Sequence, residues 1–144
     1  MQTIHIKKLD PRATLPAYQT AGAAAFDFSL IEDVTVAPRG VTKVRTGLVI
    51  QVPTGYFLQI VARSSSPIKK GLTMANGAAV IDSDYCGPND EIFLLLLNLT
   101  DQEIQLAAGD RVAQGLILPV LQATIQEVSE MTAIDRGGHG STGT

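Results

Sequence analysis

Gly47-Leu-Val-Ile-Gln-Val52 and Tyr56-Phe-Leu-Gln-Ile-Val61 are short apolar segments rich in β-branched and aromatic residues. Segments of this length and composition, bounded by turn residues, are typical of β-strands. Pro53-Thr-Gly55 separates them, and this combination of residues predicts a tight hairpin connection. The stretch from residue 47 to residue 61 therefore indicates that the chain is built from strands.

The same period of two extends outward in both directions along the chain. Further strands are expected at residues 3–7, 34–36, 41–45, 105–110 and 112–120. The apolar run at 92–99 could be a buried helix, but its length and flanking turn residues favour a strand buried on both faces. Only residues 67–74 suggest a short helix. Short strands with turns every eight to twelve residues predict an all-β sandwich, jelly roll or barrel.

The length of 144 residues predicts one domain with a sizeable core. We expect residues 1–130 to form this domain. Residues 131–144 are rich in Gly, Ser and Thr without periodicity, and they predict a mobile C-terminal arm.

Composition narrows the functional classes. The chain is 45% hydrophobic and 17% charged, with a net charge of −3 and a pI near 5.2. This acidic balance argues against stable binding of double-stranded nucleic acid, which favours a basic surface. The single Cys86 excludes an intrachain disulfide, and the longest apolar run is far too short to span a membrane. We expect a soluble, cytoplasmic protein that binds no membrane.

The segment Asn76-Gly-Ala-Ala-Val-Ile-Asp-Ser-Asp-Tyr85 is the strongest candidate for chemistry. It combines an amide, two carboxylates and a tyrosine beside an apolar run. Two interpretations stay open at this point. The segment is either a solvated turn, or it holds a carboxylate at the lip of a pocket.

Two other segments combine arginine with hydroxyl groups. In Ala62-Arg-Ser-Ser-Ser-Pro67, Ser65 or Ser66 is a reasonable helix N-cap, and the same residues could also hold a phosphate. The tail Arg136-Gly-Gly-His-Gly-Ser-Thr-Gly143 repeats these ingredients, although a disordered end is the simpler interpretation.

Metal and nucleophile signatures are weak. Asp27 lies in an apolar context. It is either a strand-edge or turn acid satisfied by backbone N–H groups, or an outer-shell partner of metal-bound water. No His, Cys or carboxylate cluster has metal-ligand spacing, so any metal would be Mg²⁺ brought by substrate phosphates. With two histidines in the chain, a Ser-His-Asp triad is not evident.

The order of these segments resembles the five motifs of the homotrimeric dUTP diphosphatases (dUTPases). The matching segments are residues 21–27, 62–65, 76–87, 108–114 and 136–143. The resemblance implies a jelly-roll homotrimer that hydrolyses dUTP to dUMP and diphosphate with Mg²⁺. Each active site would be shared between subunits. The activity would limit uracil incorporation into DNA and supply dUMP for dTMP synthesis.

The resemblance also implies residue roles in the third motif. Asp82 would be the general base that activates the water attacking the α-phosphate. Asn76, with Gly77 and Val80 of the same hairpin, would bind the uracil edge. Tyr85 would pack on the deoxyribose and exclude a 2′-hydroxyl group.

The remaining motifs imply contacts to the phosphates and the metal. Those expected at the phosphates are Arg63, Ser64, Ser65, Gln114, Arg136, Ser141 and Thr142. His139, beside Gly140, stands where the family usually has a Phe over the uracil. Asp27 would act on Mg²⁺ from the outer shell, through water. Closure of the tail would complete the site.

The chain departs from the family pattern in three places. The fifth motif is about two residues shorter than usual, Cys86 replaces a basic residue, and residues 88–90 lengthen the next turn. We expect that longer turn to be a surface excursion without effect on Asp82. Two alternatives are a dCTP deaminase of the same superfamily, and a non-catalytic trimer that binds a partner.

Overall fold

The computed structural model describes residues 2–135 and 137, and strands dominate this part of the chain. The strands are β1 (His5–Lys8), β2 (Ala17–Tyr18), β3 (Phe26–Ser29), β4 (Val34–Val36), β5 (Val41–Arg45), β6 (Leu48–Gln51), β7 (Tyr56–Ala62), β8 (Leu72–Met74), β9 (Ala78–Ile81), β10 (Phe93–Asn98), β11 (Ile104–Leu106) and β12 (Arg111–Pro119). The predicted all-β fold is confirmed. Among the described residues, no helix has the length and apolar character needed to cross a membrane.

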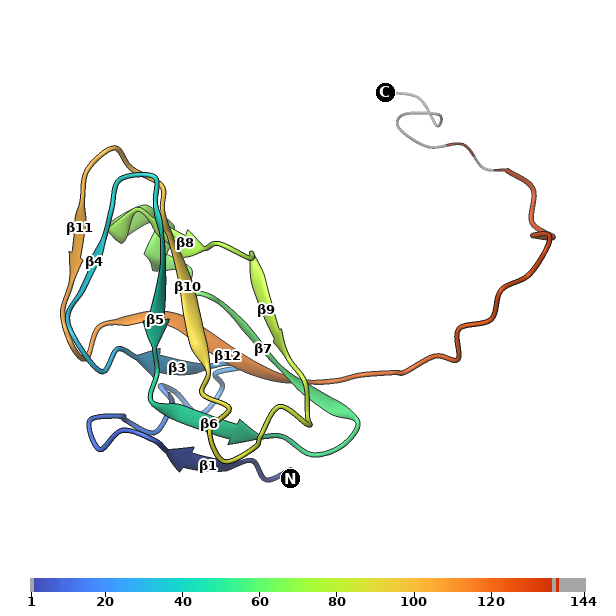
Figure 1. Ribbon diagram of the computed structural model, residues 1–144, viewed down its shortest axis with the longest axis horizontal. Coiled ribbons are helices and arrows are strands. Elements are labelled where there is room, and N and C mark those ends of the chain that lie inside the picture. Colours follow the sequence, from blue (N-terminus) through green and yellow to red (C-terminus); the bar gives the residue numbers. More distant parts are fainter. Residues whose placement is uncertain (1, 136, 138–144) are drawn as a thin grey trace.

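The strands form antiparallel sheets that enclose one core (Figure 1). The largest sheet has the order β2-β3-β12-β7-β9, and a second has the order β5-β10-β8. Two further ribbons pair β1 with β6 and β11 with β4. Because sheets bury one face each, inward side chains from β7, β3 and β10 meet in the core.

Packing at the centre of the large sheet is tight. Phe26 and Phe28 of β3 are buried, and their rings lie 5.6 Å apart between centroids. Gly115 of β12 lies opposite Phe26, and a Cβ added there would stand 2.7 Å from Phe26 Cε2. Only a glycine at position 115 leaves room for the two rings to lie this close to the β12 backbone.

The hairpin predicted at residues 53–55 is wrong. Tyr56 N–H does bond to Pro53 O at 3.1 Å, so a tight turn is present. The flanking strands do not pair with each other, because β6 pairs with β1 whereas β7 pairs with β9 and β12. The turn reverses the chain at a corner between sheets, and local turn chemistry does not specify the partner strands.

The run at residues 92–99 is a strand, as predicted, but only one of its faces is buried in this chain. Leu94, Leu96 and Asn98 are buried, whereas Phe93, Leu95 and Leu97 are only half-buried. Burial on both faces is therefore wrong for the single chain. The half-buried leucines and phenylalanine leave an apolar stripe along β10.

The helix predicted at residues 67–74 is shorter than expected. It is a single π-helical turn, Ser66–Lys70, and Ser65 makes no side-chain capping bond. Gly71 ends the turn with a left-handed φ of 65°. Residues Leu72–Met74 instead form β8, in which the outer two side chains are buried. In so short a segment, a period of two and a helical period are hard to separate.

The chain leaves the strand-rich body after β12. Residues 121–135 are exposed and contain no strand or helix. Figure 1 shows this segment extending away from the body. The expected boundary near residue 131 stays a prediction, but the last strand ends earlier, at Pro119.

Candidate active site

An edge strand, β9, organises the Asn76–Tyr85 segment. β9 pairs with β7 in a register that places Ala78 opposite Val61 and Ile81 opposite Leu58. The turn before it depends on Gly77, whose φ of 66° lies in the left-handed region that favours glycine. Gly77 N–H bonds to Met74 O at 3.0 Å and holds this turn closed. The sequence predicted a loop or hairpin here, and the structure adds a paired strand.

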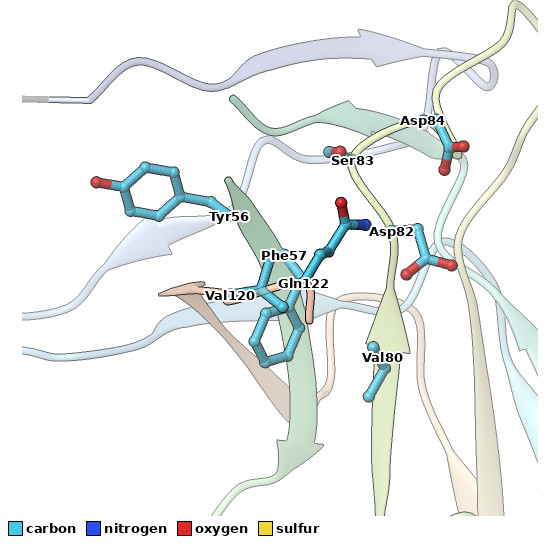
Figure 2. A pocket seen from close by; sticks show the side chains of 8 residues that line it. All are labelled: Tyr56, Phe57, Val80, Asp82, Ser83, Asp84, Val120 and Gln122. Atoms are coloured by element: carbon cyan, nitrogen blue, oxygen red, sulfur yellow. The ribbon is translucent and has the colours of Figure 1, made fainter. Parts of the chain in front are cut away.

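Asp82 directly follows β9 and is exposed. Its carbonyl oxygen accepts a bond from Tyr85 N–H at 3.2 Å, which forms the next turn. A cavity of about 470 Å³ opens here, lined by Tyr56, Phe57, Val80, Asp82, Ser83, Asp84, Val120 and Gln122 (Figure 2). A carboxylate therefore stands at the mouth of a polar cavity that water can enter.

A second cavity, of about 390 Å³, lies along the same strand. Its lining residues are Lys43, Asn76, Ala79, Val80, Ile81, Tyr85, Glu91, Ile92, Phe93 and Leu95. Asn76 and Tyr85 share this cavity, and Val80 lines both cavities. Two cavities thus meet at Val80 of β9. One is mainly apolar and is lined by Asn76 and Tyr85, and the other is lined by Asp82.

Asp27 connects two arginines from distant parts of the chain. It is 7% exposed, and Arg63 Nε and Arg111 Nη1 each lie 3.1 Å from one of its carboxylate oxygens. Arg63 Nη1 also donates to Arg111 O at 3.2 Å. Because one carboxylate meets two guanidinium groups, this cluster keeps an excess of positive charge.

Gln114 lies beside this cluster on β12. In the sheet it is opposite Asp27 on one side and Val61 on the other. Its Nε2 donates to Ala62 O at 3.3 Å. Ser64 is exposed and Ser65 is half-buried, whereas the buried Ser66 Oγ donates to Val112 O at 2.9 Å. Ser66 therefore has a structural partner, and Ser64 and Ser65 directly follow Arg63 in the chain.

The two groups of residues lie at opposite ends of β7. Ile81 lies opposite Leu58 in this antiparallel pair, so the continued register places Asp82 beside Phe57, six positions before Arg63. At about 3.3 Å per residue, this separation is roughly 20 Å along the strand. Within one chain, Asn76, Asp82 and Tyr85 therefore form one group, and Arg63 and Gln114 form a second group that is separate from it.

Other expected site residues fall beyond the described part of the chain. These are Arg136, His139, Gly140, Ser141 and Thr142, which lie outside residues 2–135 and 137. Their expected contacts to nucleotide stay predictions.

The described residues offer no direct metal site. Within residues 2–135 and 137, no group of three or more His, Cys, Asp or Glu side chains could hold a metal ion. Both oxygens of Asp27 face guanidinium groups, so this carboxylate is not arranged as a metal ligand. A divalent ion would have to take its ligands mainly from phosphate oxygens and water.

Sequence reasoning missed two residues that belong to these two groups. Arg111 shares Asp27 with Arg63, and Glu91 lines the cavity of Tyr85. Arg111 looked like an ordinary strand residue, and Glu91 followed an inserted turn, so neither had a local signal. The pairing of β3 with β12 is what brings Arg111 to Asp27.

Comparisons with known proteins agree with this architecture. The family model described as dUTPase matches residues 11–144. Proteins named deoxyuridine 5′-triphosphate nucleotidohydrolase from Wolinella succinogenes and Nautilia profundicola are 43% and 44% identical to this chain. The matches cover 97% of this chain in both cases, and 93% and 98% of those proteins respectively.

Solved structures match the fold as well. The dUTPase from Streptococcus mutans has a TM-score of 0.76 and 36% identity, covering 83% of this chain and 98% of that one. A Staphylococcus bacteriophage 80alpha dUTPase mutant, solved with dUpNHpp, has a TM-score of 0.87 and covers 100% of both chains. At 20% identity, this second likeness concerns the fold alone.

Proposed function

Because the chain belongs to the dUTPase family, we propose that it hydrolyses dUTP to dUMP and diphosphate at sites built around β9. The observation that carries this proposal is the placement of Asn76, Asp82 and Tyr85 around β9, where they line two cavities that share Val80. An apolar pocket with a few polar groups suits a nucleoside, and a carboxylate in the neighbouring cavity suits the reacting phosphate.

Asp82 acts as the general base in this proposal. It accepts a proton from water, whose oxygen forms a bond to the α-phosphorus. The bond from that phosphorus to the oxygen bridging to the β-phosphate breaks, and the electron pair leaves with diphosphate. The exposure of Asp82 at the mouth of the 470 Å³ cavity supports this role, because the attacking water can reach it.

The nucleoside occupies the 390 Å³ cavity. The Asn76 amide offers both a donor and an acceptor, which suits the uracil edge. The backbone of Gly77 and the side chain of Val80 complete the wall, and Tyr85 packs on the deoxyribose. A ring that fills the space beside C2′ disfavours a ribonucleotide.

Arg63, Ser64, Ser65 and Gln114 bind the phosphates. Asp27 holds the Arg63 guanidinium in place, which supports a positioning role for this carboxylate. Since Arg63 and Asp82 of one chain lie roughly 20 Å apart along β7, the phosphate-binding half of each site comes from another copy. The half-buried apolar stripe on β10 also favours association, and we propose a homotrimer with shared sites.

The C-terminal arm closes over the bound nucleotide. Arg136, Ser141 and Thr142 contact the β- and γ-phosphates, and His139 with Gly140 covers the uracil. Mg²⁺, when bound, would take most of its ligands from phosphate oxygens and water and would neutralise triphosphate charge, with Asp27 at most an outer-shell partner. Closure excludes bulk water and completes the site.

The reaction implies a place in the cell. We propose a cytoplasmic enzyme that limits the uracil available for DNA synthesis and supplies dUMP for dTMP. Assays with dUTP and with dCTP test the reaction class. Diphosphate release from dUTP supports the proposal, whereas ammonia release from dCTP would identify a deaminase.

A further inference from the structure

Glu91 is a buried carboxylate with a full set of partners. It is 8% exposed and follows the turn at residues 87–90. Arg45 Nε lies 3.1 Å from each of its carboxylate oxygens, and Arg45 Nη2 is 3.1 Å from Oε2. Gly47 N–H donates to Oε1 at 2.8 Å. A buried carboxylate with this many partners is held in one position. Moving it away from Arg45 would leave a buried charge without its counter-charge.

The backbone of Glu91 in turn holds Tyr85. The Tyr85 hydroxyl donates a hydrogen bond to Glu91 O at 3.2 Å. Both residues line the 390 Å³ cavity that also contains Asn76. Tyr85 is 41% exposed, so neighbouring side chains do not fully fix its ring. The hydroxyl bond ties the outer end of the ring to a residue whose side chain is anchored in the body.

The anchor extends further into the fold. Arg45 Nη1 lies 3.6 Å from Asp10, and Asp10 accepts bonds from the backbone and the side chain of Arg12. Glu32 lies 3.5 Å from Arg12, so opposite charges alternate along the series. Networks of this kind hold geometry better than isolated pairs.

The inserted turn brings Glu91 to this anchor. Asp90 Oδ2 accepts a bond from Gly87 N–H at 2.7 Å, and Glu91 N–H bonds to Asn89 O at 2.8 Å. Lys7 Nζ of β1 donates to Pro88 O at 2.8 Å. The turn lies at the surface, as expected, and it is closed on itself and bonded to a neighbouring strand.

We propose that Glu91 is a positioning residue for Tyr85 and thereby sets the preference for a 2′-deoxyribose over a ribose. This inference rests on the proposed function, in which Tyr85 packs on the sugar. A ring held at both ends keeps the space beside C2′ filled. A ring whose outer end moves leaves room for a 2′-hydroxyl group, so ribonucleotides enter more readily.

Kinetics with dUTP and UTP test the proposal. Glu91→Gln keeps the size of the side chain and loses its charge, and Glu103→Gln is the matched control on an exposed glutamate. For Glu91→Gln, the ratio of kcat/KM for dUTP to that for UTP is expected to fall about three- to tenfold, as for one weakened hydrogen bond. Tyr85→Phe removes the hydroxyl and is expected to lower the ratio similarly.

The double variant separates positioning from general damage. In the Tyr85→Phe background, Glu91→Gln is expected to change the ratio by less than about twofold, since the link is already broken. An unchanged ratio in Tyr85→Phe would overturn the proposal. So would equal and additive losses from the two substitutions, which would mean that Glu91 acts without Tyr85.

A measurement without substrate keeps this inference distinct from the proposed function. With ¹³C-labelled tyrosine, NMR of the intact protein reports on the Tyr85 ring directly. Glu91→Gln is expected to shift or average its ring signals, and Glu103→Gln is expected to leave them unchanged. Unchanged Tyr85 signals in Glu91→Gln overturn the positioning role whatever the substrate. Failure of the unaltered enzyme to hydrolyse dUTP would instead overturn the proposed function.

Discussion

Arg63 Nε lies 3.1 Å from Asp27 Oδ1, and this ion pair joins β3 to the end of β7. Arg111 binds the other oxygen of the same carboxylate. A carboxylate shared by two guanidinium groups brings the two arginines together and orients them. This geometry leads to a prediction that separates positioning of arginine from a role at the metal.

Asp27→Asn is expected to lower activity at every Mg²⁺ concentration. The substitution removes the negative charge that the two guanidinium groups share, so we also expect the free energy of unfolding to fall. The fall should be about 1–2 kcal/mol, because both arginines are partly exposed. Activity titrated against Mg²⁺ and urea unfolding check the two effects. Full recovery of activity at high Mg²⁺ would instead support an outer-shell role for Asp27.

Asp82→Asn is expected to lower kcat by about 10²- to 10⁴-fold, because an amide cannot accept the proton of the attacking water. Binding of dUTP, measured by calorimetry, should persist. Asp84→Asn is the natural comparison, because Asp84 lines the same cavity two residues away. A loss from Asp84→Asn as large as that from Asp82→Asn would contradict the assignment of the base.

Deletion of residues 136–144 is expected to reduce kcat roughly a hundredfold or more, since donors to the phosphates are lost. The last strand ends at Pro119, so the unfolding temperature of the body should barely change. Deletion of Gly143 and Thr144 alone provides a control, because neither is assigned a contact. Full activity without residues 136–144 would contradict closure of the arm.

Acid is expected to weaken the fold partly through Asp10. Hydrogen bonds from the Arg12 side chain, and then from its backbone, hold the pKa of Asp10 well below its ordinary value of 3.8. A lowered pKa contributes stability above the unfolded-state value, and this contribution is lost as pH falls below about 3.8 toward the folded-state pKa. Asp10→Asn should therefore be less stable than the unaltered chain at neutral pH and show a smaller acid-dependent loss. Urea midpoints across pH test this.

Gly115→Ala is expected to lower the free energy of unfolding by about 1–3 kcal/mol, because the added methyl group meets two buried rings. Its Cβ would stand 2.7 Å from Phe26 and 2.9 Å from Phe28. Gly22→Ala is the control, since nothing lies within 4 Å of its Cβ, and its effect should be within about 0.5 kcal/mol. Similar urea midpoints for the two variants would show that β3 and β12 adjust freely.

Most strands could be predicted from the sequence, because a strand with one buried face alternates apolar and polar residues. The sequence placed β4 and β5 at their observed bounds. It failed where pairing is decided far away, as at Pro53–Gly55, whose turn joins strands of different sheets. The ion pairs of Asp27 with Arg111 and of Glu91 with Arg45 could not be predicted for the same reason. The two residues of each pair come together only when the strands pair.

The separation of Asp82 and Arg63 along β7 has a consequence for genetics. Where each site takes Asp82 from one copy and Arg63 from another, two inactive alleles are able to complement each other. An assembly that mixes Asp82→Asn chains with Arg63→Ala chains contains some sites in which both intact side chains meet. Mixing the two inactive variants would then restore part of the activity. Dominance between the alleles would depend on how their subunits combine in one assembly.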